Sequence, residues 1–188
     1  MPDPSSLIDL LKARHDEFEL LKRRTPIAIY GSFYRDRRGD LVRLRDYLRG
    51  HGYAARISED LDDGTGSEIP SIRDRELSER LIDESTAHIF VMPRRRPEES
   101  DTLIQSVSME LERLCTLIEC GAKQKQPIAV FFEEGLMDRE RWGFGGVCRG
   151  LLARQTTWTV GEFEHIEDIF AEARSFCMQA LWEQEGVE

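Results

Sequence analysis

The chain has 188 residues and a formal net charge of −10, with 26 Lys and Arg residues against 36 Asp and Glu residues. Hydrophobic residues make up 40% of it, which is enough for a real core and excludes global disorder despite 33% charged residues. The acidic balance argues against general nucleic-acid binding, because such binding depends on basic surface. We therefore expect one globular domain over residues 1–188 that has no nucleic-acid partner.

The sequence also argues against a membrane location and a metal site. No apolar run approaches the ~18 residues of a membrane span, and residues 1–6 lack the charged-then-apolar order of a signal peptide. We expect no membrane partner and a cytoplasmic location. The cysteines form no C-x-x-C pair, and no His lies close to any two of them, so we expect no metal site. Neither G-x-G-x-x-G nor G-x-x-x-x-G-K-[ST] occurs, and we expect no bound cofactor.

Helical and strand patterns alternate along the chain. An amphipathic helix is predicted over residues 6–24, and at Pro26 the pattern changes to a short apolar strand over residues 26–33. The polar stretch 34–39 is predicted to be a loop. The elements predicted after it are a helix at 40–51, a strand at 53–58, a helix at 72–85, a strand at 87–92, a helix at 103–120, strands at 127–132 and 155–160, and a helix at 163–182.

This alternation predicts an α/β protein with a three-layer, doubly wound parallel sheet of four or five strands, flavodoxin-like, with an extra N-terminal helix. Residues 1–25 form that extra helix, residues 26–160 the sheet core and residues 161–188 the closing helix. A common strand order for such sheets is 2-1-3-4-5, in which the first and third strands are neighbours.

Ligands of such sheets bind at the carboxyl ends of the strands. This rule selects as candidate ligand contacts Gly31, Ser32, Phe33, Tyr34, Arg94, Arg95, Arg96 and Ser106. Glycine lets a ligand approach the backbone, although it can also simply end a strand. Guanidinium groups bind phosphate in bidentate fashion, although these arginines could instead balance the nearby acidic residues. Arg35, Arg37 and Arg38 lie in the loop after the first strand, and Arg94 to Arg96 lie in the loop after the third. Two arginine-bearing loops at one edge would suit a small anionic ligand.

Glu110 is the best catalytic candidate. It lies early in the predicted helix 103–120, whose apolar side would face the sheet. Partial burial of its carboxyl group would raise its pKa and suit it to acid–base or nucleophilic work. The alternative is a glutamate on the helix surface.

The segment order resembles two known families. Residues 27–32 (Ile-Ala-Ile-Tyr-Gly-Ser), residues 88–93 (His-Ile-Phe-Val-Met-Pro) and the helix start at 106–111 are similar to nucleoside 2-deoxyribosyltransferase-like and TIR-like domains. The resemblance covers roughly residues 26–135. It implies that Glu110 corresponds to the catalytic glutamate of these families, which acts on the N-glycosidic bond of a nucleoside or of NAD.

A second motif of the deoxyribosyltransferases, D-x-G-T-x-x-E, occurs at residues 62–68. Here it follows the second predicted strand rather than a later one, and Pro70 prevents a helix from continuing through it. We interpret it mainly as a turn-rich loop and take Glu68 as a secondary candidate carboxylate.

Two hypotheses about function result. The leading one is a domain that binds a nucleotide or nucleoside and cleaves or transfers an N-glycosidic bond through Glu110. The alternative is a non-catalytic interaction or regulatory module of the same fold that self-associates as a homodimer. The N-terminal helix and the aromatic residues near the end of the chain motivate this alternative, although the same residues could simply cover the sheet.

Overall fold

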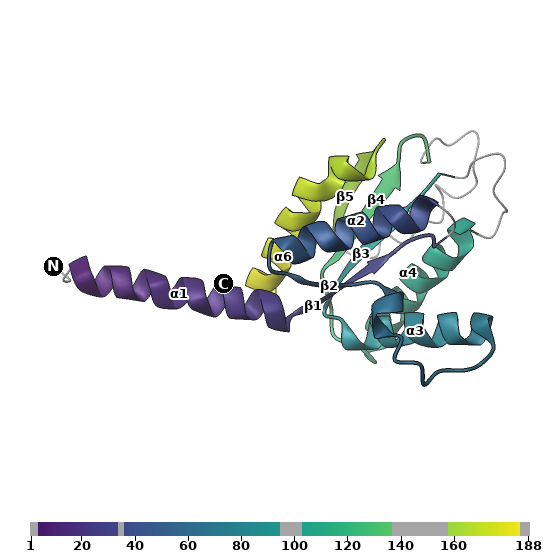
Figure 1. Ribbon diagram of the computed structural model, residues 1–188, viewed down its shortest axis with the longest axis horizontal. Helices are drawn as coiled ribbons and strands as arrows, with labels where there is room; N and C mark the ends of the chain where they lie inside the picture. Colours follow the sequence, from purple (N-terminus) through teal and green to yellow (C-terminus); the bar gives the residue numbers. More distant parts are fainter. Residues whose placement is uncertain (1–3, 34–35, 95–102, 137–157, 185–188) are drawn as a thin grey trace.

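The computed structural model describes residues 4–33, 36–94, 103–136 and 158–184. At its centre is a five-stranded sheet in the order β2-β1-β3-β4-β5, in which all neighbouring strands are parallel (Figure 1). The strands are β1 (Pro26–Tyr30), β2 (Ala54–Arg56), β3 (Ala87–Met92), β4 (Ile128–Glu133) and β5 (Trp158–Phe163). The predicted α/β class and doubly wound, flavodoxin-like parallel sheet are confirmed, and the observed strand order is the common one that the sequence left open.

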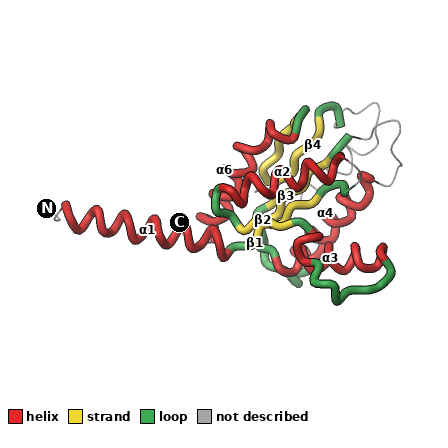
Figure 2. Tube along the Cα trace, viewed as in Figure 1, coloured by secondary structure: helices red, strands yellow, loops and turns green. Residues whose placement is uncertain are grey.

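Helices cover both faces of the sheet (Figure 2). One face carries α2 (Asp36–Gly50) and α6 (Phe170–Gln184), and the other carries α3 (Pro70–Glu84) and α4 (Leu103–Glu119). Two short 3-10 helices, η1 (Ser58–Leu61) and η2 (Ile166–Ile169), precede α3 and α6. The arrangement has the three layers expected from the sequence.

The strands are apolar because both of their faces are buried. All six residues of β3 are buried, and its side chains alternate between the two faces. Ile89 and Val91 belong to the core under α2 and α6, whereas Phe90 and Met92 belong to the core under α3 and α4. The sheet therefore separates two cores, and a polar side chain within a strand belongs to one of them.

The first helix, α1 (Pro4–Arg24), precedes the sheet and projects away from the rest of the molecule (Figure 1). Its last turns contact the domain: Phe18 stacks on Trp182 of α6 with ring centroids 5.4 Å apart, and Leu21 packs against the core under α2 and α6. Residues 8–17 are exposed throughout.

Two predicted boundaries were wrong in instructive ways. Helix α2 begins at Asp36 rather than at residue 40, because Arg37, only 8% exposed, is anchored by an ion pair to the distant Glu133. Strand β5 ends at Phe163, so the closing segment starts in a strand and α6 begins only at Phe170. Because β5 is an edge strand in which Val160 is 47% exposed, its composition is mixed and predicted the ends of the strand poorly. Residues 155–157 lie outside the described part of the chain.

A search of the described helices for membrane spans found none that combines the necessary length with the necessary apolar character.

Candidate active site

Glu110 lies in the middle of α4, on the side that faces α3. Its carboxyl group is partly buried, and the Ser78 hydroxyl of α3 donates a hydrogen bond to its Oε1 at 2.6 Å. Burial raises the pKa of Glu110 to about 7, and the hydrogen bond from Ser78 opposes this increase. The carboxyl group therefore exchanges between its acid and base forms near neutral pH.

The negative charge of Glu110 acts on Tyr30, a buried residue of β1. This tyrosine is the last residue of β1, is 2% exposed and lies in the core under α3 and α4. Its pKa is raised well above the ordinary value, first by burial and then by the negative charges of Glu110 and Asp83. Because the Tyr30 hydroxyl lies beside His88, the second residue of β3, the charge of Glu110 acts inside the core under α3 and α4. In this strand order the crossovers from β1 to β2 and from β2 to β3 lie on opposite faces, so the β1–β3 boundary is the topological switch point.

A buried chain of hydrogen bonds starts at the same tyrosine. The Tyr30 hydroxyl and His88 Nδ1 are 3.0 Å apart, and His88 Nε2 lies 2.6 Å from Gln126 Oε1. The Gln126 amide nitrogen donates to the carbonyl oxygen of Ser85 at 3.2 Å. This last bond sets the orientation of the amide, so His88 Nε2 carries the proton and Nδ1 accepts from Tyr30. Burial lowers the pKa of His88 to about 3, which keeps its ring neutral.

At the end of β1, the glycine predicted to contact a ligand has a clear packing role. A Cβ atom on Gly31 would lie 2.5 Å from Cδ2 of Leu41, which is buried in α2. Glycine is therefore required for α2 to approach the sheet. Ser32 is buried and Phe33 packs against the core under α2 and α6, while Tyr34 lies outside the described residues. Their contact with a ligand remains a prediction.

We expect Gly31→Ala to lower the free energy of unfolding by about 1–3 kcal/mol, because the methyl group overpacks the contact with Leu41. Gly39→Ala is the matched control: Gly39 lies in the same helix as Leu41, and its added Cβ meets no atom within 4 Å. The control should gain about 0.5–1 kcal/mol from helix propensity. Urea unfolding of both variants measures the difference. Equal stabilities of the two variants would contradict the packing role of Gly31.

An ion-pair cluster ties the ends of two strands, β3 and β4, to α2 at the same edge. Glu133 at the end of β4 accepts hydrogen bonds from Arg37 Nη1 and from the backbone nitrogen of Arg94, each at 2.7 Å. Arg37 Nη2 also donates to the carbonyl oxygen of Arg94 at 2.9 Å, and Arg94 Nη1 donates to that of Glu134 at 3.2 Å. The Arg37 and Glu133 side chains are 9% and 13% exposed. The buried carboxylate of Glu133 thus fixes the loop after β3 against α2 and β4.

These contacts change how the basic residues at this edge are understood. Arg37 is paired with Glu133, and Arg38 forms a bidentate pair with Glu59, with its shortest contact at 2.7 Å. Acidic side chains therefore neutralise much of the expected basic character of this edge. Arg95 and Arg96 lie outside the described residues, so a phosphate contact from the 94–96 loop remains a prediction. Ser106 is exposed on α4 one turn before Glu110, and so shares its helix face.

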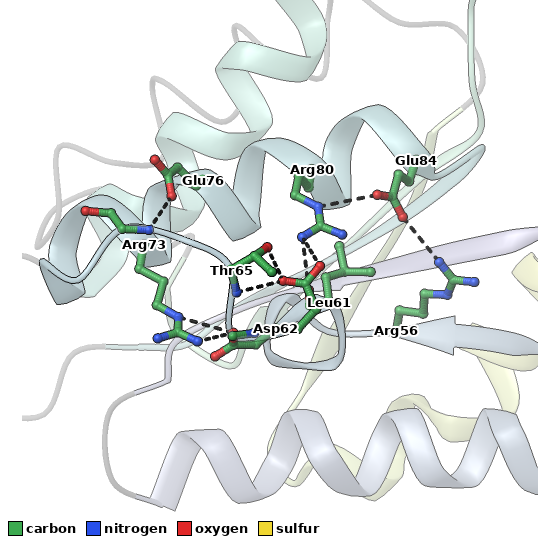
Figure 3. Close-up of polar contacts among 11 residues, drawn as sticks. Arg56, Leu61, Asp62, Thr65, Arg73, Glu76, Arg80 and Glu84 are labelled. Carbon is green, nitrogen blue, oxygen red and sulfur yellow. Dashed lines mark hydrogen bonds and ion pairs between the residues drawn. The ribbon is translucent and has the colours of Figure 1, made fainter.

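The D-x-G-T-x-x-E segment forms a loop that is held against α3 by ion pairs (Figure 3). Asp62 accepts from the backbone of Gly64, and Asp63 accepts from that of Thr65, each at 3.0 Å. The guanidinium groups of Arg73 and Arg80 bind these two aspartates from α3. The prediction of a turn-rich loop is consistent with this arrangement. Glu68 is exposed, and no described contact brings it to Glu110.

A cleft of about 380 Å³ lies between this loop and α3. Its lining is mostly charged and includes Asp63, Arg73, Glu76 and Arg80, but neither Glu110 nor Ser78. Among the described residues, no group of three or more His, Cys, Asp or Glu side chains could hold a metal ion.

Sequence reasoning selected Glu110 but missed the residues around it, namely Ser78, Tyr30 and His88. Two of them carried a signal that could have been used. Tyr30 and His88 are polar residues inside otherwise apolar, doubly buried strands, and such residues need a buried hydrogen-bond partner. Ser78 is an ordinary polar residue of an amphipathic helix, and nothing in the local sequence marks it.

No protein-family model matches the chain, and a search of curated proteins found no significant match. The fold and the geometry around Glu110 are therefore the features that bear on function.

Proposed function

We propose that the protein binds a nucleoside or nucleotide at the β1–β3 switch point and cleaves or transfers its N-glycosidic bond through Glu110. The observation that carries the proposal is the Glu110 carboxyl group itself. It is partly buried, it is held by Ser78 at 2.6 Å, and its charge acts on the buried hydroxyl of Tyr30 in the core under α3 and α4. Carboxyl groups with a perturbed pKa are characteristic of active sites.

The chemistry requires a carboxylate beside the anomeric carbon. When the C1′–N bond breaks, its electron pair leaves with the base, and the sugar becomes oxocarbenium-like. Ionised Glu110 would stabilise this cation or bond to C1′, and water or an acceptor nucleoside would then take the sugar. The hydrogen bond from Ser78 would orient the carboxylate and favour its ionised form. Because Arg37 and Arg38 at this edge are paired with acidic residues, a nucleoside suits the described surface better than a multiply charged nucleotide.

The test is release of free base from a panel of purine and pyrimidine nucleosides and NAD, followed by liquid chromatography. We expect the wild-type rate to rise between pH 6 and pH 8 as Glu110 ionises around its pKa of about 7. Glu110→Gln should lower the rate at least ~100-fold, because an amide cannot supply the negative charge. Glu112→Gln, a change at an exposed position of the same helix, should keep the wild-type rate. Absence of base release from every substrate, or equal rates for Glu110→Gln and wild type, would overturn the proposal.

The alternative expected from the sequence, a non-catalytic interaction module, predicts no base release in this assay. It would retain the fold and the buried Glu110 without turnover. The same experiment therefore separates the two hypotheses.

A further inference from the structure

The contact between α3 and α4 contains an ion-pair group beside the hydrogen bond from Ser78 to Glu110. Glu79 follows Ser78 in α3, and its Oε1 accepts from Arg75 Nε of the same helix at 2.9 Å. The same oxygen accepts from Arg113 Nη1 of α4 at 3.0 Å. The hydrogen bond from Arg75, together with the charge of Arg113, lowers the pKa of Glu79. An ionised Glu79 therefore binds two guanidinium groups next to the candidate active site.

Arg113 is also a potential partner of Glu110. The two residues are three positions apart in α4, with the acidic residue nearer the N-terminus, and side chains at this spacing are neighbours on one side of a helix. Arg113 extends to Glu79 of α3 instead. In the described part of the chain, no cation forms an ion pair with Glu110, and burial is the main cause of its raised pKa.

The other titratable groups of this core supply no positive charge to Glu110. His88 is neutral because burial lowers its pKa to about 3, and Tyr30 keeps its proton because its pKa is raised well above the ordinary value. Asp83 of α3 is an anion, and its charge acts on Tyr30 as that of Glu110 does. Lys123 is a cation, but it donates to two backbone carbonyl oxygens at the end of α3.

We propose that Glu79 is a positioning residue of the candidate active site, because it binds Arg113 and so keeps this guanidinium group away from the Glu110 carboxyl group. This role rests on the proposed function, since Glu110 is the group that would act on C1′. Without Glu79, Arg113 would pair with Glu110 along α4. A guanidinium group beside a carboxyl group favours its ionised form and lowers its pKa. Glu79 thereby sets the pH range in which Glu110 gains and loses its proton.

The titration of Glu110, followed by NMR of protein labelled with carbon-13 at the glutamate carboxyl groups, tests this role without any substrate. The resonance of Glu110 is the one that is absent from Glu110→Gln. In the wild-type protein it should titrate near pH 7. In Glu79→Ala the pKa of Glu110 should fall by about one unit or more, because Arg113 becomes free to pair with it. The pH of half-maximal base release should fall by the same amount.

Three further variants make the test specific. Arg113→Met should leave the pKa of Glu110 unchanged, because Glu79 already holds that guanidinium group away. The double variant Glu79→Ala/Arg113→Met should return the pKa to the wild-type value, because the competing guanidinium group is gone. Glu84→Ala is the matched control: it makes the same change in α3, but Glu84 pairs with Arg80 and another arginine, and the pKa of Glu110 should stay near 7.

An unchanged pKa of Glu110 in Glu79→Ala would overturn the positioning role of Glu79. A lowered pKa that persists in the double variant would overturn it as well, because Arg113 would not be the group responsible. Circular dichroism confirms that each variant is folded. Absence of base release from every nucleoside would overturn the proposed function alone, since the titration of Glu110 needs no substrate and still decides where Arg113 binds.

Discussion

Glu110→Gln should be more stable than the wild-type protein at pH 8, by about 3 kcal/mol, and equally stable at pH 4. The pKa of Glu110 is raised from 4.5 to about 7 by burial. Between these values the unfolded chain loses a proton that the folded protein keeps, so the stability of the wild type falls as the pH rises through this interval. The difference between the two pKa values corresponds to a loss of roughly 3 kcal/mol in the free energy of unfolding of the wild type, and the whole loss is present above pH 7. The amide has no charge to bury and avoids the loss.

Thermal unfolding at several pH values measures this effect. For a chain of this length, 3 kcal/mol corresponds to about 6–12 °C in Tm. Glu112→Gln is the matched control, because it makes the same change at an exposed position of the same helix. A destabilised Glu110→Gln at pH 8, or a difference that is the same at pH 4 and pH 8, would show that the carboxyl group is not strained by burial. A residue that lowers stability while supporting activity is typical of functional sites.

The second large effect concerns the carboxylate at the end of β4. We expect Glu133→Gln to lower the free energy of unfolding by about 3 kcal/mol, because Arg37 then loses its carboxylate in a site where both side chains are largely buried. The backbone nitrogen of Arg94 loses its charged acceptor at the same time. Urea unfolding gives the value, and hydrogen exchange should show faster opening of the first turn of α2.

Two comparisons make this prediction specific. Glu134→Gln changes the neighbouring residue, whose side chain is exposed and whose carbonyl oxygen still accepts from Arg94, and should alter stability by less than about 0.5 kcal/mol. The double variant Arg37→Met/Glu133→Leu should be more stable than Glu133→Gln, because an apolar pair leaves no buried charge behind. If Glu133→Gln and Glu134→Gln unfold alike, the ion-pair cluster does not anchor α2.

The fold was predictable where the local pattern had one dominant cause. Strand β3 was predicted with its observed bounds, Ala87–Met92, because burial on both faces makes the strand continuously apolar. Prediction failed where the cause lay far away in the sequence. The first turn of α2 has the composition of a polar loop. It is anchored by the ion pair of Arg37 with Glu133, which lies 96 positions later in the sequence. Strand β5 lies at the edge of the sheet and pairs with β4 only, so its composition did not indicate where the strand begins and ends.

The candidate site shows the same division. The position of Glu110 on the sheet-facing helix after β3 could be inferred from chain order and helical spacing. Its hydrogen bond to Ser78 could not, because that contact joins two helices whose relative rotation depends on the packing of the whole core. The packing role of Gly31 was equally hidden, since it depends on how closely Leu41 approaches β1.

The hydrogen-bond chain from Tyr30 to Gln126 has a calorimetric consequence. Because the folded protein keeps His88 neutral down to about pH 3, unfolding takes up a proton at His88 between pH 3 and 6.5. Unfolding releases a proton from Glu110 between pH 4.5 and about 7. Near pH 5.5 the proton taken up by His88 and the proton released by Glu110 cancel. These two groups then add almost nothing to the dependence of the unfolding heat on the ionisation enthalpy of the buffer. In Glu110→Gln that dependence would show the single proton taken up by His88.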